Sequence, residues 1–237
     1  MIVSIIIPVY NEIGTLAQVL QQVLAAPLPP GCDREILVVD GGSTDGSRAF
    51  LTSIAHPGIK TILYASNGRP PFGKGTAIRV ALDQVRGECV LIQDADLEYD
   101  PADYSRLFGP MISGQAEVVF GSRFLNGCRR QELGMSSGSW LANRILSGTA
   151  NILYRAGLSD EATAYKVFRT ELLRSLQLRC RRFEFCPEVT AKLCRRGIRI
   201  HEVPVQYHAR SRASGKKIRA RDGCVALWTL LRYRVGN

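Results

Sequence analysis

Short apolar runs alternate with helical patterns along the first part of the chain. Residues 3–12 form an apolar run rich in β-branched side chains that ends in polar residues, and residues 15–26 then show a helical pattern. Residues 35–40 form a second apolar run, and residues 41–47 supply a flexible turn and capping residues for a further helix. Such alternation is typical of a parallel α/β sheet, in which ligands bind at the carboxyl ends of the strands.

A cluster of carboxylates follows a third apolar run, within residues 91–101. Asp94 and Asp96 are separated by one small residue directly after this run, so both can direct their oxygens to one point. Hard divalent cations such as Mg²⁺ and Mn²⁺ take oxygen ligands and can keep open positions for substrate phosphates. An isolated pair of this kind also occurs as a solvated acidic turn. Because Asp40 likewise falls at the end of a strand-like run, the pattern favours a metal and phosphate site.

Four motifs in chain order resemble the inverting glycosyltransferases of family two. They are the PVYNE segment at residues 8–12, VDGGSTDG at residues 39–46, GKG at residues 73–75, and the aspartate cluster. Within that family the chain is most similar to the dolichyl-phosphate mannosyltransferase group. This narrower match rests on residues 94–101, 121–124, 165–168, 188–192 and 215–218. The motifs run in family order over nearly the whole chain.

Two positions depart from the pattern of the family. Gly41 stands where relatives often have Asp, and Ala162 replaces the acidic residue expected directly before Thr163. Glu161 supplies a carboxylate one place earlier. The second departure concerns the details of the sugar or acceptor pocket.

The resemblance implies one α/β domain over residues 1–237. It would be a Rossmann-like nucleotide-diphospho-sugar transferase domain of the glycosyltransferase A type, with a mostly parallel central sheet flanked by helices. Residues 1–100 would form the nucleotide-binding half, and residues 101–237 the acceptor half with a basic C-terminal segment. The 237 residues, of which 46% are hydrophobic, suffice for such a core. Seven cysteines without a C-x-x-C pair read as reduced thiols.

The resemblance also assigns the donor side of the site. Asp94 and Asp96 would be catalytic and hold Mg²⁺ or Mn²⁺, with Glu98 as a third, weaker metal ligand; Glu98 could instead be a helix-start carboxylate. The nucleotide sugar would be bound by Pro8, Tyr10, Glu12, Asp40, Lys74 and Asp94. Asp40 could instead form only a turn, and Lys74 could be a surface lysine. The glycines at residues 73 and 75 suggest a loop whose backbone N–H groups approach phosphate.

The charge of the acceptor indicates which residues would bind it. A phosphate monoester is already anionic near neutral pH, with a second pKa of about 6, so it can attack without a general base. It needs cations to position it. The resemblance to lipid-phosphate glycosyltransferases favours polyprenyl or dolichyl phosphate, with Arg123 also counted as catalytic. The acceptor phosphate would be bound by Arg123, Arg210, Arg212, Lys216 and Lys217. Residues 127–138 and 210–217 are long, polar, basic loops that suit lids.

The net charge of +10 is concentrated in the C-terminal third of the chain. A basic face attracts nucleic acid, an anionic membrane or a phosphorylated substrate. Without a nucleic-acid-binding motif, we expect no nucleic-acid partner. Residues 225–234 mix Trp, Tyr and Leu with Arg, which suits either a helix in the membrane interface or a terminal helix packed on the domain. No run is long enough to cross a bilayer, so we expect a cytoplasmic protein, peripheral on the cytosolic face of a membrane.

Three functions therefore stand as hypotheses. The first is an inverting transfer of a hexose, mannose from GDP-mannose before others, to a polyprenyl phosphate. The second keeps the site but uses UDP-glucose or another nucleotide sugar, or a hydroxyl acceptor on a glycan. The third is a non-catalytic scaffold that binds nucleotide sugar or an acidic membrane and docks a separate membrane-anchoring subunit. Retention of the whole aspartate cluster speaks against the third.

Overall fold

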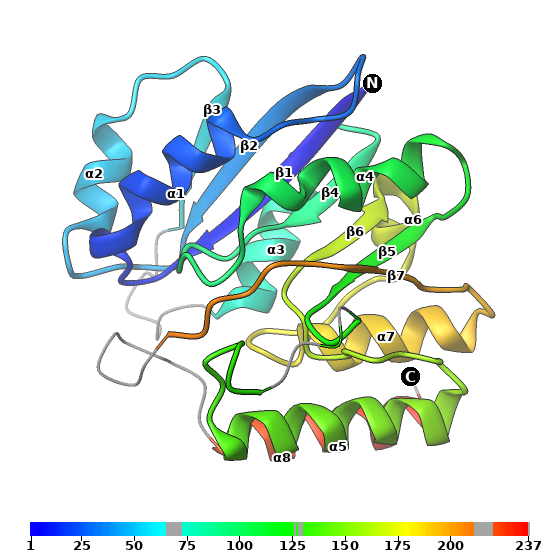
Figure 1. The fold of residues 1–237 in the computed structure, drawn as a ribbon. Helices are drawn as coiled ribbons and strands as arrows, with labels where there is room; N and C mark the ends of the chain where they lie inside the picture. Colours follow the sequence, from blue (N-terminus) through cyan, green and yellow to red (C-terminus); the bar gives the residue numbers. More distant parts are fainter. Residues whose placement is uncertain (65–72, 126, 128–129, 211–219, 237) are drawn as a thin grey trace.

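A single seven-stranded sheet runs through the molecule in the order β3-β2-β1-β4-β6-β5-β7 (Figure 1). The computed structural model describes residues 1–64, 73–125, 127, 130–210 and 220–236. The strands are β1 (Ile2–Val9), β2 (Asp33–Asp40), β3 (Ile59–Leu63), β4 (Cys89–Ile92), β5 (Val118–Ser122), β6 (Lys166–Arg169) and β7 (His201–Pro204). All neighbouring strands pair in parallel except β6, which is antiparallel to both β4 and β5. The predicted mostly parallel α/β sheet is confirmed.

The central strand β1 shows why the chain folds this way. Its side chains alternate between the two faces of the sheet, so Ile5 and Ile7 enter one core and Ile6 enters the other. Both cores are apolar, and a strand buried on both faces reads as an almost continuous hydrophobic run. The predicted strand at residues 3–12 ends at Val9, where the chain leaves the sheet.

Helices cover both faces of the sheet. One face carries α1 (Ile13–Ala25), α2 (Ser47–Ser53), the short 3₁₀ turn η1 (Pro101–Asp103) and α4 (Tyr104–Ile112). The other carries α3 (Lys74–Leu82), α6 (Thr170–Ser175) and α7 (Phe185–Arg195). Each helix contributes an apolar stripe that packs on the sheet.

Two further helices, α5 (Ser137–Tyr154) and α8 (Ala220–Val235), form an outer layer over α7. Leu146 and Ala150 of α5 pack with Ala226 and Leu230 of α8 and with Ala191 of α7. The two helices lie side by side along the lower edge of the molecule in Figure 1. None of the helices in the described ranges combines the length and the hydropathy needed to span a bilayer. The cysteines within these ranges are free thiols, as the sequence predicts.

Candidate functional site

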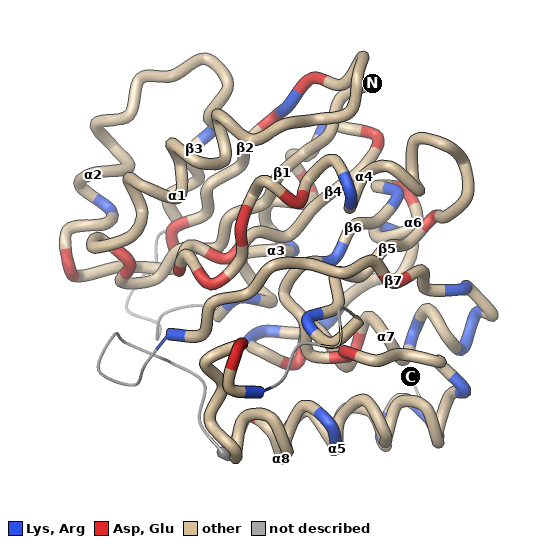
Figure 2. Tube along the Cα trace, in the orientation of Figure 1, with Lys and Arg blue, Asp and Glu red and all other residues tan. Residues whose placement is uncertain are grey.

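The strands β2, β1 and β4 are neighbours in the sheet, and their carboxyl ends carry the predicted polar residues. Asp40 is the last residue of β2, Tyr10 and Glu12 follow β1, and Asp94 and Asp96 follow β4. Figure 2 shows acidic residues gathered along this edge of the sheet. Side chains from three separate segments therefore meet where ligands bind in open α/β sheets.

Lys74 lies against the first aspartate of the cluster. Its Nζ is 2.6 Å from Asp94 Oδ1, and the lysine side chain is only 12% exposed. Burial lowers the pKa of Lys74, but Asp94, Cys186 and Asp96 together raise it by more, so the net shift is upward. The lysine therefore stays protonated beside the aspartate. It is a site cation and not the surface lysine that the sequence left open.

Arg210 pairs with Asp96, as Lys74 pairs with Asp94. Its Nη2 lies 3.1 Å from Asp96 Oδ2, and its Nη1 lies 3.1 Å from Glu12 Oε2. Burial and the nearby carboxylates of Asp94 and Glu98 raise the pKa of Asp96 to about 7, against the lowering effect of Arg210. The site therefore concentrates negative charge that cations compensate. Arg210 Nε is buried and has no hydrogen-bond partner within the described residues.

Glu98, the third predicted metal ligand, accepts two hydrogen bonds from the segment that follows β7. Its Oε2 accepts a hydrogen bond of 3.0 Å from the Tyr207 hydroxyl, and its Oε1 accepts one of 2.8 Å from the Arg210 backbone N–H. Leu97, directly between Asp96 and Glu98, has a φ of +61°. This left-handed conformation is unfavourable for a leucine and marks a tight, constrained turn in the site.

The loop after β1 is tied to the loop after β2. Asn11 donates its backbone N–H to Ser43 Oγ at 2.9 Å, and its Oδ1 accepts from the Thr44 N–H at 2.8 Å. Asp45 Oδ2 accepts from the Ile13 N–H at 3.0 Å, at the start of α1. These cross-loop contacts hold the half-buried Pro8 and Tyr10 at the sheet edge. Their predicted nucleotide contacts stay predictions.

Asp40 is fully buried and acts at least as a turn residue. Its carboxylate accepts hydrogen bonds from the Gly42 and Ser43 N–H groups and lies 3.0 Å from Arg48 Nη1. This is the turn role that the sequence left open for Asp40. Its nucleoside contact stays a prediction, as an addition to that role.

Arg123 follows β5 at the same edge of the sheet, and Asp160 fixes it there. Nε and Nη2 of Arg123 donate to the two Asp160 oxygens, both at 2.6 Å, and the arginine side chain is 6% exposed. Burial lowers the pKa of Arg123, but Asp160, Tyr99 and Tyr207 together raise it by more. The guanidinium also lies 5.0 Å from the centre of the Tyr207 ring. Its binding of an acceptor phosphate stays a prediction, because the pair with Asp160 already uses two of its donors.

The backbone N–H groups of Gly75 and Thr76, at the start of α3, are bonded within the protein. The Gly75 and Thr76 N–H groups donate to the carbonyl oxygens of Arg182 and Arg181, at 2.9 and 3.1 Å, so they are not left for a phosphate. A Cβ on Gly73 would lie 2.8 Å from Arg181 O, and one on Gly75 would lie 2.9 Å from Cys180. The glycines are explained by close packing of the helix start against residues 180–182.

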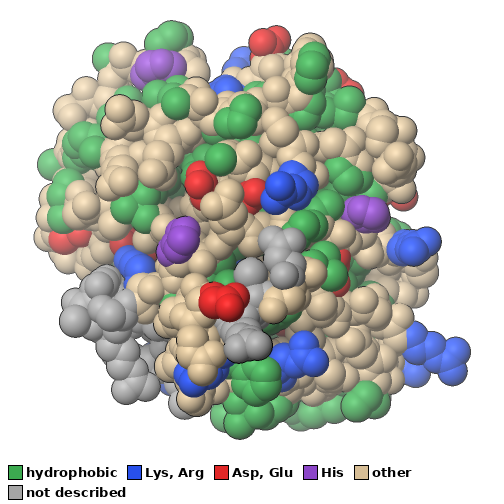
Figure 3. Space-filling view, in the orientation of Figure 1, with side chains coloured by type: hydrophobic (Ala, Val, Ile, Leu, Met, Phe, Trp, Pro, Cys, Tyr) green, Lys and Arg blue, Asp and Glu red, His purple; other side chains and the backbone are tan. Residues whose placement is uncertain are grey.

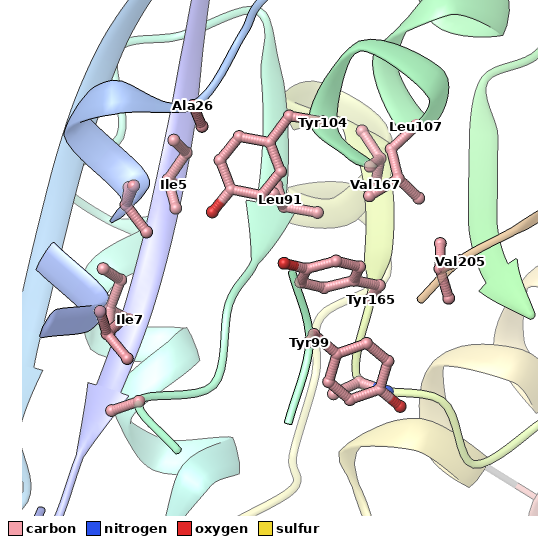
Figure 4. Close-up of a cluster of buried hydrophobic side chains, with 14 of the residues drawn as sticks. Ile5, Ile7, Ala26, Leu91, Tyr99, Tyr104, Leu107, Tyr165, Val167 and Val205 are labelled. Atoms are coloured by element: carbon pink, nitrogen blue, oxygen red, sulfur yellow. The ribbon is translucent and has the colours of Figure 1, made fainter. Parts of the chain in front are cut away.

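Several residues of the site gave no sequence signal. Gln93 is buried directly before the aspartates, and its Oε1 accepts hydrogen bonds from the Tyr104 and Tyr165 hydroxyls, both at 2.7 Å. Figure 4 shows these two rings with Tyr99 in the core beside β4. Gln93 Nε2 donates to the Asp94 carbonyl, so this network orients the first aspartate. Only tertiary contacts reveal the role of Gln93.

The donor set fits a hard divalent cation that also binds substrate. Within the described residues, no three His, Cys, Asp or Glu side chains gather into a complete metal site. Two carboxylates do lie at the site: Asp94 pairs with Lys74, and Asp96 pairs with Arg210. Mg²⁺ sites of this type use one or two carboxylates together with substrate phosphates. The predicted acceptor residues Arg212, Lys216 and Lys217 lie outside the described residues.

The model of the family described as glycosyl transferase family 2 matches residues 4–177. The chain belongs to this family. It is 30% identical over 219 residues to an undecaprenyl-phosphate 4-deoxy-4-formamido-L-arabinose transferase from Edwardsiella ictaluri, over 90% of this chain and 62% of the relative. It is 27% identical to glycosyltransferase AglJ from Haloferax volcanii, over 99% of the chain and 73% of the relative. The chain thus spans under two thirds of the first relative.

Solved structures support the fold. Glucosyl-3-phosphoglycerate synthase from Mycobacterium tuberculosis, in complex with Mn²⁺, UDP and phosphoglyceric acid, superposes with a TM-score of 0.71 at 19% identity, over 99% of this chain and 79% of that one. Mannosyl-3-phosphoglycerate synthase from Rubrobacter xylanophilus gives 0.70 at 21% identity, over 99% and 73%. The fold expected from the family motifs is therefore confirmed.

Proposed function

We propose that the chain transfers a hexose from a nucleotide sugar to a polyprenyl phosphate, with inversion at the anomeric carbon. The observation that carries the proposal is the meeting of Glu12, Asp94 and Asp96 with the cations Lys74 and Arg210 at the ends of β1 and β4. The polyprenyl phosphate is supported by the name of the undecaprenyl-phosphate relative. We keep GDP-mannose as the first donor to test and UDP-hexoses as the alternative.

The donor would bind over Asp94 and Asp96. The chemistry that Mg²⁺ or Mn²⁺ supplies at such a site is Lewis-acid stabilisation of the leaving pyrophosphate. Lys74 holds Asp94 in place and adds positive charge next to the leaving group. The cross-loop contacts of Asn11 and Asp45 fix the edge on which the nucleoside would lie. A rigid site of this kind positions the anomeric carbon for a single displacement.

The acceptor phosphate would approach from the β5 side of the edge. Arg123 is fixed there by Asp160, and the buried Nε of Arg210 offers a donor to a phosphate oxygen. Arginine suits this task because its planar fork matches phosphate geometry. Because the phosphate monoester is anionic, the reaction needs no carboxylate base on this side. Inversion follows from one displacement, so an α-linked donor would give a β-linked lipid.

We further propose that the outer layer rests on a membrane, at its cytosolic face. Figure 3 shows apolar side chains along the lower edge of the molecule, where α5 and α8 lie. We call this surface the α5–α8 face. Its exposed apolar side chains are Trp140, Leu141, Ile145 and Ile152 of α5 and Val225, Trp228, Leu231 and Val235 of α8. Large apolar side chains flanked by arginine suit the membrane interface.

A donor-by-acceptor screen with the purified chain tests the transfer. GDP-mannose and a set of UDP-hexoses are each incubated with short polyprenyl phosphates, and the glycolipid is detected by mass spectrometry. We expect product from one donor, dependent on a divalent cation, and none with the polyprenol that lacks phosphate. Binding of a nucleotide sugar without product from any acceptor would instead support the scaffold hypothesis.

A further inference from the structure

A cavity lies away from the carboxylate cluster. It is formed by the segment joining α6 to α7, the end of α7 and the end of α8. It has a volume of about 240 Å³. A water molecule in the liquid takes about 30 Å³, so the cavity has room for a phosphate group and some water. No residue of the carboxylate cluster lines it. Figure 2 shows Lys and Arg gathered where α7 ends.

The lining of this cavity is strongly basic. Four cationic side chains surround it together with Tyr233: Arg179, Lys192, Arg195 and Arg196. Lys192 has a carboxylate partner, since its Nζ lies 2.6 Å from Glu188 Oε1. Positive charges that converge on one cavity repel one another unless an anion joins them.

Glu188 pairs with Lys192, and its carboxylate is already occupied by hydrogen-bond donors. Besides Lys192, its carboxylate accepts hydrogen bonds from the Arg179 and Cys180 N–H groups and from the Tyr233 hydroxyl, at 2.6 to 2.9 Å. Burial raises the pKa of Glu188, but these donors lower it by more, so it is a saturated internal anion. Its four donors leave it little capacity to bind a further cation.

Arg179 and Arg196 are the two cations that can accept a new anion. Across the described ranges, neither has a carboxylate within 4.0 Å. Arg196 is held in place by hydrogen bonds from Nη1 to Ser175 Oγ, at 2.6 Å, and from Nη2 to Ser175 O, at 2.7 Å. The guanidinium of Arg196 is therefore prearranged at the cavity, and the side chains of both arginines are exposed.

We propose that this cavity binds a phosphate-bearing anion. Arginine forks are suited to phosphate oxygens, and Tyr233 contributes an aromatic wall. The cavity borders the C-terminal part of α8, where Leu231 and Val235 are exposed. An anionic phospholipid headgroup therefore fits the location, and this choice of source rests on the proposed membrane face. A soluble phosphate compound would use the same contacts.

Vesicle binding of matched single-charge variants tests the proposal. Arg179→Gln and Arg196→Gln each remove one charge at the cavity, and Lys60→Gln removes one on β3, at the far edge of the sheet. Binding is measured by co-sedimentation with phosphatidylcholine vesicles that contain phosphatidylglycerol or lack it. We expect each cavity variant to weaken binding to the anionic vesicles about fivefold, as for a basic residue at the bilayer surface. Lys60→Gln should bind like wild type.

A second experiment distinguishes a lipid headgroup from a soluble phosphate compound as the ligand of the cavity. Amide shifts at Gln177, Arg179 and Tyr233 are followed by nuclear magnetic resonance while inorganic phosphate is added. Loss of vesicle binding without such shifts assigns the cavity to a lipid headgroup, and saturable shifts that Arg179→Gln removes assign it to a soluble phosphate. Equal vesicle binding by all three variants, with no shifts at these amides, would overturn the proposal. Nucleotide-sugar binding by calorimetry that Arg179→Gln and Arg196→Gln leave unchanged reports on the transferase site.

Discussion

Arg210 Nη2 lies 3.1 Å from Asp96 Oδ2, so a side chain of the C-terminal third compensates the predicted metal ligand. The same guanidinium reaches Glu12, which follows β1. It thereby links the end of β1 to the end of β4 from a segment that follows β7. A cation that binds Asp96 must compete with Arg210 or share the carboxylate with it.

Arg210→Gln should increase the affinity of the nucleotide-free protein for Mn²⁺. Removing the arginine removes the cation paired with Asp96, and loss of one competing charge-assisted contact corresponds to about tenfold or more. Mn²⁺ binding can be measured by electron paramagnetic resonance of the free ion. Arg48→Gln is the control, because Arg48 pairs with Asp40 at the neighbouring strand end. A lower affinity in Arg210→Gln would show that the arginine supports the metal site instead of competing for it.

Asp96→Asn should reduce turnover by roughly a hundredfold or more, because one oxygen ligand and its charge are lost where the pyrophosphate leaves. Asp94→Asn should have nearly the same effect and should also release Lys74. Turnover is measured with and without a chelator. Asp83→Asn, an exposed carboxylate at the end of α3, should leave turnover unchanged. Full activity in the chelator would exclude the metal from the mechanism.

Arg123→Lys should lower the free energy of unfolding by about 2 kcal/mol, because a lysine cannot form the two-pronged contact with Asp160. Arg106→Lys is the control, since Arg106 pairs with Asp103 but its side chain is 50% exposed. Urea unfolding measures both. If Arg123 also binds the acceptor, the apparent KM for lipid phosphate should rise while donor affinity stays constant. An unchanged KM would limit Arg123 to holding the site together.

Glu35 makes folding stability depend on pH. Burial raises the pKa of Glu35, but hydrogen bonds from Ser4 Oγ and from Arg86 lower it by more, so the folded value lies below the unfolded one. Its stabilisation is complete above the unfolded value of about 4.3 and is lost as the pH falls through the lower folded value.

Glu35→Gln tests this pH dependence. Near neutral pH, the substitution should lower the free energy of unfolding by about 1–3 kcal/mol, because the buried charged acceptor is lost. The difference between wild type and variant should shrink in acid, below the folded pKa. The exposed Asp33, on the same strand, gives the control Asp33→Asn with little change at any pH. A difference that persists unchanged in acid would mean that Glu35 stabilises by packing alone.

If the α5–α8 face rests on a membrane, vesicle binding should weaken when this face loses apolar surface. Trp228→Ala should reduce binding about tenfold, in line with the 1.5–3 kcal/mol for burying a large apolar side chain. The side chain of Trp228 is 64% exposed, so the fold should tolerate the change. Ile112→Ser, on α4 across the sheet, is the matched control. Equal losses of vesicle binding in Trp228→Ala and Ile112→Ser would contradict the proposal that the α5–α8 face contacts the bilayer.

The donor edge was predictable because it depends on local sequence. A β-branched run followed by a polar residue places that residue at a strand end, which is why Asp40, Asp94 and Asp96 were found. The end of β5 before Arg123 was predictable for the same reason.

The remaining site residues were not predictable, because their roles depend on contacts across the chain. Asp160 lies 37 residues from Arg123 in sequence, and Gln93 acts through Tyr165, 72 residues away. The close packing of the glycines around Lys74 was not predicted, because close packing and phosphate approach favour the same residue. Helix α5 keeps large apolar side chains on its exposed side, so it lacks the polar outer face expected of a surface helix.

The reversed strand β6 brings a further loop to the edge of the sheet that carries the site. Because β6 runs against β4 and β5, the loop that precedes it reaches the same edge where those strands end. That loop carries Asp160 and the departure at Ala162, whereas the proposed nucleotide side lies at the ends of β1, β2 and β4. Under the proposed function, substitutions in one short loop would therefore change the acceptor side without altering β1, β2 and β4.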